Sequence, residues 1–521
     1  PIDYYGINNY SLTTATEQPY NNKSDHRSAS LAVRRRFGFL PFPASLELGG
    51  TRSTLKVDAR VQTITWTYAG PDGNTATPDS AAPYQMQSYR NQDSHYGFTN
   101  VPWVSVNRAY DRLDLFVKTP ANLVAAEQSR ITGSEFLRET VTAAYAQAEA
   151  RLLRNRLTVL GGARFEQTDD SGRGPLVDLA AVFVRNANGS FARNAAGQRI
   201  RKPEAGAAGS MEELRLTRRE RGYAVTRSYD GIYPSLHATF TASENFLVRA
   251  AWARTYGRPD LVDVIPNAQF AENDLNEQDQ NNPAIVKGTI TVRNTALRPW
   301  TADNFDLSAE YYTEGGGLVS AGVFRKDIRN FFGTQVRLAD AATLEELGLD
   351  AAYVGWNVNS KFNAGSARIS GAEFNVRQSL RRLGRWGAPF TLFANATSLR
   401  LEGNRQADFT SFIPRTGNWG ASFNWRRVSF VARWNYRGLD KRTAMPAVGT
   451  NAFQYFGART SLDLNGSYQL SKRLSLVASA NNVFNVPQVL LRYGDETPAY
   501  ARQNRTSEFG IALALGVKGS F

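Results

Sequence analysis

The segment SEFGIALALGVKGSF, residues 507–521, decides the fold. Apolar side chains occupy alternate positions, and small or polar residues fill the positions between them. A period of two residues is typical of a β-strand with one face against an apolar medium. The segment therefore predicts a strand with one apolar and one small or polar face. The apolar positions are Phe509, Ile511, Leu513, Leu515, Val517 and Phe521.

The same alternation recurs along the chain, for example in residues 462–470, 428–437 and 246–252. Many of these segments exceed the 9 to 11 residues that a tilted strand needs to cross a bilayer. We count about 15 strands, near 26–36, 44–69, 138–153, 156–169, 222–241, 245–256, 301–313, 317–335, 364–382, 389–404, 412–426, 428–440, 451–470, 472–485 and 505–521.

The lengths of the connections separate a soluble sandwich from a membrane barrel. Turns of a few residues, near 153–156, 242–245, 314–317, 426–428 and 470–473, alternate with long connections. Short turns on one edge and long loops on the other are typical of outer-membrane barrels. The predicted fold class is all-β: a transmembrane, antiparallel, up-and-down β-barrel with short periplasmic turns and long external loops. The long connections are near 70–137, 170–221, 257–300 and 336–363.

Composition narrows the function classes. The 521 residues include no Cys and only three His, which excludes a disulfide scaffold, a Cys zinc site and a thiol nucleophile. The net charge is +14, but beyond residues 34–36 the basic residues are scattered, so we expect no nucleic-acid partner. No Ser/His/Asp grouping and no phosphate-binding loop stand out. We therefore predict no enzyme activity, no catalytic residue, no metal ligand and no cofactor.

Local propensity conflicts with this fold at one place. Residues 139–157, ETVTAAYAQAEARLLRNRL, favour a helix by composition. We predict two strands joined near 154–156 instead, because the following LTVLGGARFEQT alternates. Two loop helices are also predicted: one capped by Thr119 with Pro120 at its first position, and one begun by a capping box of Thr343 and Glu346.

Several segments, in this order, resemble the TonB-dependent outer-membrane receptors: the paired strands ETVTAAYAQAEARLLRNRLTVLGGARFEQT, the hairpin ending YGRPDLVDVIP, the block TALRPWTADNFDLSAEYYTEGGGLVSAGVFRKDIRNFF, then SARISGAEFNVRQSL, and NNVFN before the C-terminal Phe521. The resemblance covers about 139–521. It implies a 22-stranded barrel around an N-terminal plug, in the outer membrane of a Gram-negative-type bacterium. It also implies energised uptake of a scarce metal chelate, vitamin or oligosaccharide, driven by the TonB energy-coupling complex.

The chain departs from the family pattern before its first predicted strand. We find no plug and no TonB box there, and about seven strands are missing. We therefore expect residues 1–521 to form one barrel domain, incomplete at its N-terminus, whose first strand near 26–36 has an open edge. The alternative is a passive diffusion porin of 16 strands, in which residues 1–12 pair with the last strand. An outer-membrane enzyme and a soluble sandwich are the remaining, less favoured readings.

Aromatic and basic residues gather in the first long connection. They could stack on a sugar or chelate and hold its anionic groups, although packing within the loop explains them as well. The candidate ligand-binding residues are Tyr84, Tyr89, Arg90, His95, Trp103 and Arg108. Phe521, a terminal aromatic on the apolar face, resembles the signal read by the barrel-assembly machinery, and that face is expected to contact outer-membrane lipid.

Acidic residues offer two further possibilities. Asp303, Asp306, Glu310 and Glu314 recur on one predicted strand, where pairing with arginines in the lumen is favoured over glycosidase chemistry. Residues 267–282 are acidic and could bind Ca²⁺, but a solvated acidic loop is favoured.

Overall fold

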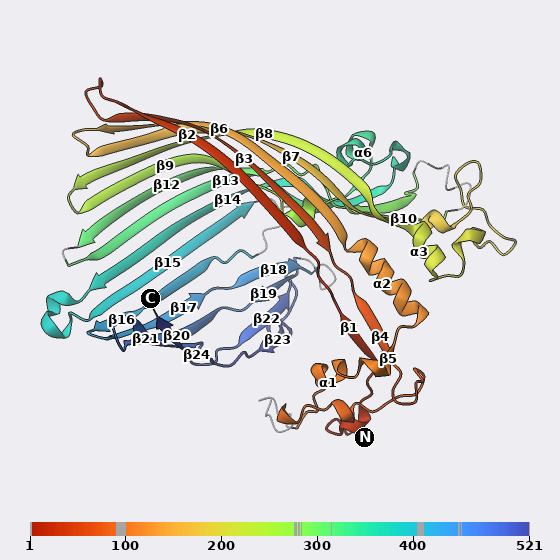
Figure 1. The fold of residues 1–521 in the computed structure, drawn as a ribbon. Helices are drawn as coiled ribbons and strands as arrows, with labels where there is room; N and C mark the ends of the chain where they lie inside the picture. Colours follow the sequence, from red (N-terminus) through yellow and green to blue (C-terminus); the bar gives the residue numbers. More distant parts are fainter. Residues whose placement is uncertain are drawn as a thin grey trace.

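The computed structural model describes residues 3–89, 100–275, 279, 282, 284–313, 315–403, 411–445, 449 and 451–519. Most of them belong to a single curved sheet (Figure 1). Seventeen strands form this sheet within the described ranges. They are β2 (Lys23–Phe37), β3 (Ala44–Arg60), β6 (Ser134–Leu152), β7 (Leu157–Asp178), β8 (Arg218–Ser243), β9 (Phe246–Gly257), β10 (Ala268–Glu272), β11 (Gly288–Val292), β12 (Trp300–Thr313), β13 (Gly317–Leu338), β14 (Asn357–Ser379), β15 (Phe390–Gly403), β16 (Arg415–Trp425), β17 (Val428–Arg437), β20 (Arg459–Gln469), β21 (Leu474–Asn481) and β24 (Ala512–Gly519).

All of these strands except β10 and β11 follow one another in an antiparallel, up-and-down wall. Short turns join the strands at one edge, and the long connections all leave from the other edge (Figure 1). This confirms the predicted fold class. The strands at the long-connection edge extend further than predicted, since β7 runs to Asp178 and β8 begins at Arg218.

The helix-like segment forms strands, as predicted. β6 and β7 pair from Leu152↔Leu157 to Phe136↔Arg173, and Leu153, Arg154 and Asn155 turn between them with positive φ angles. β6 pairs with β7 along one edge and with β3 along the other. This pairing on both edges outweighs the helical propensity of its residues.

The alternation of the sequence gives the wall two chemically different faces. Leu307, Phe374 and Trp419 lie on one face and remain 52%, 46% and 42% exposed. The other face carries a polar row of directly paired residues on adjacent strands. This row is Ser320, Asn375, Asn395, Asn418 and Asn435. The apolar face is the one suited to lipid, and the polar face is the one suited to a wet lumen.

The segment that decides the fold is not one strand. β23 (Gln503–Ser507) and β24 are separate, and Gly510 between them has a φ of +74°. The alternation therefore holds only from Ala512 onward. Leu513, Leu515 and Val517 are 75%, 87% and 65% exposed, as expected for a lipid-facing row.

The edges of the wall are open in the part of the chain that the structure describes. β2 pairs with β3, and β24 pairs with β21, but no pairing joins β2 to β24. Residues 3–12 contain only the turn η1 (Ile7–Asn9) and an isolated bridge from Ser11 to Ser80. The described residues therefore lack the ladder that the porin alternative requires, and the first strand has the predicted open edge.

Segments outside the main sheet form two smaller sheets. One consists of β1 (Thr14–Glu17), β4 (Ile64–Tyr68) and β5 (Phe116–Val117), and the other of β18 (Asp440–Ala444), β19 (Phe453–Phe456), β22 (Gln488–Tyr493) and β23. Two segments predicted as single strands are therefore each two strands. Residues 44–69 form β3 and β4, and residues 451–470 form β19 and β20.

The helices of the described residues also lie in the connections. They are α1 (Val106–Tyr110), α2 (Pro120–Thr132), α3 (Met211–Thr217), α4 (Leu261–Val264) and α6 (Ala341–Leu347). Short 3-10 turns accompany them: η2 (Ala82–Tyr84), η3 (Gln87–Tyr89), η4 (Leu113–Leu115), η5 (Leu179–Val182), η6 (Pro203–Ala205), η7 (Ala351–Tyr353), η8 (Arg381–Trp386) and η9 (Ala499–Ala501). No helix among the residues described is long and apolar enough to cross a membrane.

One of the two predicted helix starts is right. Thr119 caps α2 and Asn122 completes the capping box, with Pro120 in the first turn. The second is wrong. Asp340 caps α6 by accepting a hydrogen bond from the Thr343 N–H at 2.7 Å, so Thr343 lies inside the helix. Asp is as good a helix cap as Thr. The helix begins after Asp340 rather than after Thr343, because the earlier start adds a turn to the helix.

A compact layer, which we call the crown, braces the long-connection edge. The hairpin β10–β11 pairs in parallel with the end of β7 on one side and the start of β14 on the other. The crown's core is buried and packs against α6. It comprises Tyr223, Ala268, Phe270, Ile290, Val292, Ala339, Leu344, Leu347, Trp356, Val358 and Phe362.

Candidate ligand-binding surfaces at the long-connection edge

The first candidate surface is the lobe around β1, β4 and β5, which contains most of the predicted ligand-binding residues. Tyr84 is only 4% exposed, and its hydroxyl lies 3.0 Å from that of Tyr68. The two rings meet edge to face at 5.9 Å, and Phe116 packs against Tyr68. Tyr84 therefore supports the lobe from within, and its side chain has little surface to offer a ligand.

Trp103 and Arg108 lie nearer to the surface of this lobe. Trp103 is 56% exposed, and its carbonyl accepts a hydrogen bond from the Met86 N–H at 2.7 Å. Arg108 donates to the carbonyl of Gln85 at 3.1 Å. Both residues thus hold the 85–86 segment, and the Trp103 ring remains open to solvent.

The remaining predicted residues fall in or next to a segment that the structure leaves undescribed. The backbone of Tyr89 ends η3, while Arg90 and His95 lie outside the described residues, as does Phe521. The role of the predicted set in ligand binding stays a prediction.

The second candidate surface is one face of the sheet β18–β19–β22–β23. Tyr455 and Tyr493 stack with ring centroids 4.3 Å apart. The Lys441 ammonium lies 3.6 Å from the centroid of the Phe453 ring, and the Arg502 guanidinium lies 4.9 Å from that of Tyr493. We call these five residues the aromatic–cation face. Strand alternation brings Phe453 and Tyr455 to the same side, and β22 supplies Tyr493 opposite Phe453.

This face can bind an anionic, planar ligand. Stacked rings offer apolar contact area, and the flanking cations offer charge. Burial raises the pKa of Tyr455, so its hydroxyl remains protonated and can donate a hydrogen bond at neutral pH. Sequence reasoning missed this surface, because residues 486–504 showed no long alternating run. The available signal was the cluster FQYF at 453–456 together with LLRY at 490–493.

Two of the carboxylates singled out in the sequence, Asp303 and Glu310, pair with arginines. Arg249 Nε lies 2.7 Å from Glu310 Oε1, and Arg254 Nε lies 3.0 Å from Asp303 Oδ1. These cross-strand pairs join β9 to β12. Glu310 lies opposite Ser320 of the polar row, so its pair confirms the favoured interpretation. Asp303 lies on the same face of β12 as Leu307, so it pairs with an arginine but its predicted place in the lumen is wrong. Glu314 lies outside the described residues.

The acidic loop also makes ion pairs. Glu272 pairs with Arg185, and Asp274 pairs with Arg193. Within the ranges described, no cluster of three or more His, Asp or Glu side chains could hold a metal ion. Glu277 of this loop is not among the residues described.

An ionic network crosses the wall near the motif that resembles the receptor family. Arg258 of the YGRP segment contacts Glu139 of β6 at 3.1 Å and Glu166 of β7 at 3.3 Å. Tyr256 also donates a hydrogen bond to Glu166. The network ties the connection after β9 to two strands of the wall, so the GRP residues have a structural role here.

Comparisons with known proteins agree with this architecture. The family model described as "TonB dependent receptor-like, beta-barrel" matches residues 2–483. The chain belongs to this family. Over 271 residues, this TonB-dependent receptor barrel is 24% identical to the ferric enterobactin receptor of Pseudomonas aeruginosa. That match covers 49% of the chain and 33% of the relative.

Two solved receptors resemble the TonB-dependent receptor barrel in fold. The pyoverdine outer-membrane receptor FpvA of Pseudomonas aeruginosa superposes with a TM-score of 0.51 at 12% identity, covering 97% of this chain and 54% of that one. The siderophore receptor PiuA of Acinetobacter baumannii gives 0.50 at 11% identity, covering 96% and 56%. The chain thus spans a third to just over half of these relatives. It is an outer-membrane protein of a receptor and transporter family.

Proposed function

We propose that the chain forms the barrel wall and capture surfaces of a receptor that takes up a scarce ligand by energised transport. A ferric or other metal chelate is the favoured class over a vitamin or an oligosaccharide. The aromatic–cation face carries this proposal, because it places two stacked tyrosines between Lys441 and Arg502 at the long-connection edge. The relative named for ferric enterobactin supports the same class.

The partners belong to the proposal as well. Energy would come from the TonB energy-coupling complex through a plug and box. The barrel-assembly machinery would insert the wall, reading Phe521. Additional strands would be needed to pair with β2 and β24, since the described ladder leaves both edges open. The same open edges weigh against the self-contained porin.

Binding of ferric enterobactin, used as the probe, tests the capture surface. The intact gene product, purified from outer membranes, is titrated while tryptophan fluorescence is recorded. We expect Tyr455→Ala and Tyr493→Ala each to weaken binding about tenfold, as for the loss of one cation-flanked stacked ring. Gln454→Ala is the matched control, because Gln454 neighbours Tyr455 on the opposite face of β19.

Energised transport is tested separately by uptake of the radioactive iron chelate into cells. Uptake that stops when a proton uncoupler is added supports a receptor. Uptake that continues unchanged, and is not saturable, would indicate a passive pore and overturn the proposal.

A further inference from the structure

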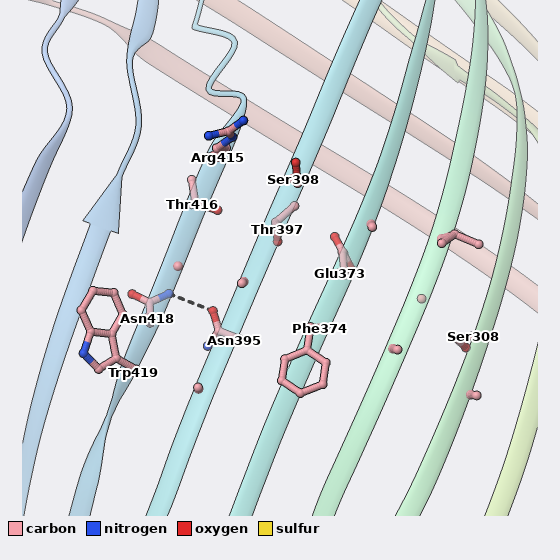
Figure 2. A pocket seen from close by; sticks show the side chains of 18 of the residues that line it. Ser308, Glu373, Phe374, Asn395, Thr397, Ser398, Arg415, Thr416, Asn418 and Trp419 are labelled. Carbon is pink, nitrogen blue, oxygen red and sulfur yellow. Dashed lines mark hydrogen bonds between the residues drawn. The ribbon is translucent and has the colours of Figure 1, made fainter.

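An apolar groove crosses the outside of the wall. It has a volume of about 1000 Å³, and strands β12 to β16 supply most of its lining (Figure 2). Its floor is a row of residues that pair directly across the sheet, and all of them except Phe374 are small. The row is Ala309, Ala321, Phe374, Ala396 and Gly417. Leu307 and Val323 wall it on one side, and Trp419 on another.

The groove belongs to the lipid-facing side of the wall. Its lining includes Leu307, Val323 and Phe374, which are 52%, 55% and 46% exposed. The alternate residues of the same strands, such as Asn395 and Asn418, hydrogen bond to each other in the polar row of the opposite face (Figure 2). An aqueous solute would not reach this side, so the occupant must come from the bilayer.

A cation stands at one end of the groove. Arg415 is the first residue of β16, directly after the connection 404–414, and lies directly opposite Ser398. β16 has 11 residues, about the number that crosses a bilayer. Because long connections mark the external edge, Arg415 sits at the level of the outer-leaflet headgroups, and Trp425 at the periplasmic end.

The Arg415 side chain is exposed. In the part of the chain that the structure describes, it forms no ion pair and no side-chain hydrogen bond. Several other arginines on the wall are held in ion pairs, for example Arg249 with Glu310. Guanidinium groups bind phosphate oxygens in a bidentate manner. Figure 2 shows Arg415 at one end of the pocket, with Phe374 and Trp419 towards the other.

We propose that this groove is a lipid-binding site for an anionic, phosphate-bearing lipid of the outer leaflet. One acyl chain lies over Ala321, Ala396 and Gly417, where the small side chains leave room. The phosphate contacts Arg415, and Ser398 supplies a hydroxyl beside it. The site is independent of the ligand captured at the long-connection edge.

The test measures lipid binding to the intact gene product, delipidated in mild detergent. Phosphatidylglycerol and phosphatidylcholine are titrated and bound lipid is counted by native mass spectrometry. We expect about tenfold tighter binding of phosphatidylglycerol, the anionic lipid. Arg415→Ala should bring the two lipids within twofold of each other, and Arg415→Lys should restore part of the preference. Ala396→Leu, which fills the floor, should weaken both.

Arg473→Ala is the matched control, because Arg473 is exposed in the short turn between β20 and β21, at the opposite edge. It should leave the preference intact. Heat-modified migration on gels confirms that each variant is folded. Equal binding of the two lipids by the unmodified protein would overturn the proposal. An Arg473→Ala effect as large as that of Arg415→Ala would overturn it too.

Discussion

Two adjacent residues of β14 provide the sharpest test of which face of the wall meets lipid. Phe374 is 46% exposed on the apolar face, and Asn375 follows it in the polar row, paired with Ser320 and Asn395. Phe374 lies five residues before Ser379, where β14 ends at the short-turn edge. A crossing takes about 9 to 11 residues, so Phe374 is near the bilayer midplane.

The expected cost of Phe374→Arg follows from that depth. An arginine on the lipid face costs roughly 2 to 4 kcal/mol at the midplane, and about 0 to 1 near the interfaces. At about 1.4 kcal/mol per factor of ten, the ratio of folded to unfolded protein should fall by roughly 30-fold to several hundredfold. Asn375→Arg places the same charge one residue away, where it can extend into a wet lumen. Its effect should stay within about 0.5 kcal/mol.

The assay is equilibrium unfolding of the intact gene product by urea in lipid vesicles. The nine tryptophans report the transition by fluorescence. Equal destabilisation by the two substitutions, or a larger loss for Asn375→Arg, would refute the assignment of the faces and with it the lipid groove.

Three further outcomes are expected. Tyr84→Ala should destabilise the lobe by about 3 to 5 kcal/mol, as for a buried aromatic, and should speed its cleavage in limited proteolysis. Trp103→Ala should leave the rate of cleavage unchanged. Equal rates of cleavage in the two variants would contradict the packing role of Tyr84. Phe521→Ser should lower the yield of folded barrel in outer membranes far more than Ser520→Ala, and equal yields would count against the assembly signal. Hydrogen bonds from Thr343 lower the pKa of Asp340. The stabilisation of α6 by the Asp340 carboxylate is therefore fully present above the pKa of the unfolded state, near 3.8, and is lost as the pH falls below it. Asp340→Asn should remove this acid dependence, measured as amide hydrogen exchange in α6.

The strands of the wall could be predicted from the sequence because the pattern that indicates each strand lies within that strand. Each strand alternates by itself, and the order of strands in an up-and-down wall is the order in the chain. Residues 139–157 have a helical composition, and their prediction as strands rests on the alternation that follows them, on the turn near 154–156 and on the resemblance to the receptor family. Thr119 and Pro120 likewise carry a helix start within four residues of sequence.

The surfaces at the long-connection edge could not be predicted in the same way. β10 pairs with β7, about 90 residues earlier, and β11 pairs with β14, about 70 residues later. Neither partner is visible in a local pattern. In the sequence, Tyr84 and Trp103 are both aromatic residues of a long connection. Packing against Tyr68 buries Tyr84, whereas Trp103 remains exposed. The aromatic–cation face depends on the register between β19 and β22, which no period encodes.

The crown makes one part of the long-connection edge more rigid than the rest. Its hairpin shares backbone hydrogen bonds with β7 and β14, two strands that are separated around the wall by β8, β9, β12 and β13. Opening either of those strand ends requires the core around Ile290 and Val358 to come apart, so this sector should open as one cooperative unit. The lobe around Tyr84 and the aromatic–cation face lie in other sheets, with their own hydrogen bonds. Local opening at this edge should therefore occur more readily in those two smaller sheets than in the crown.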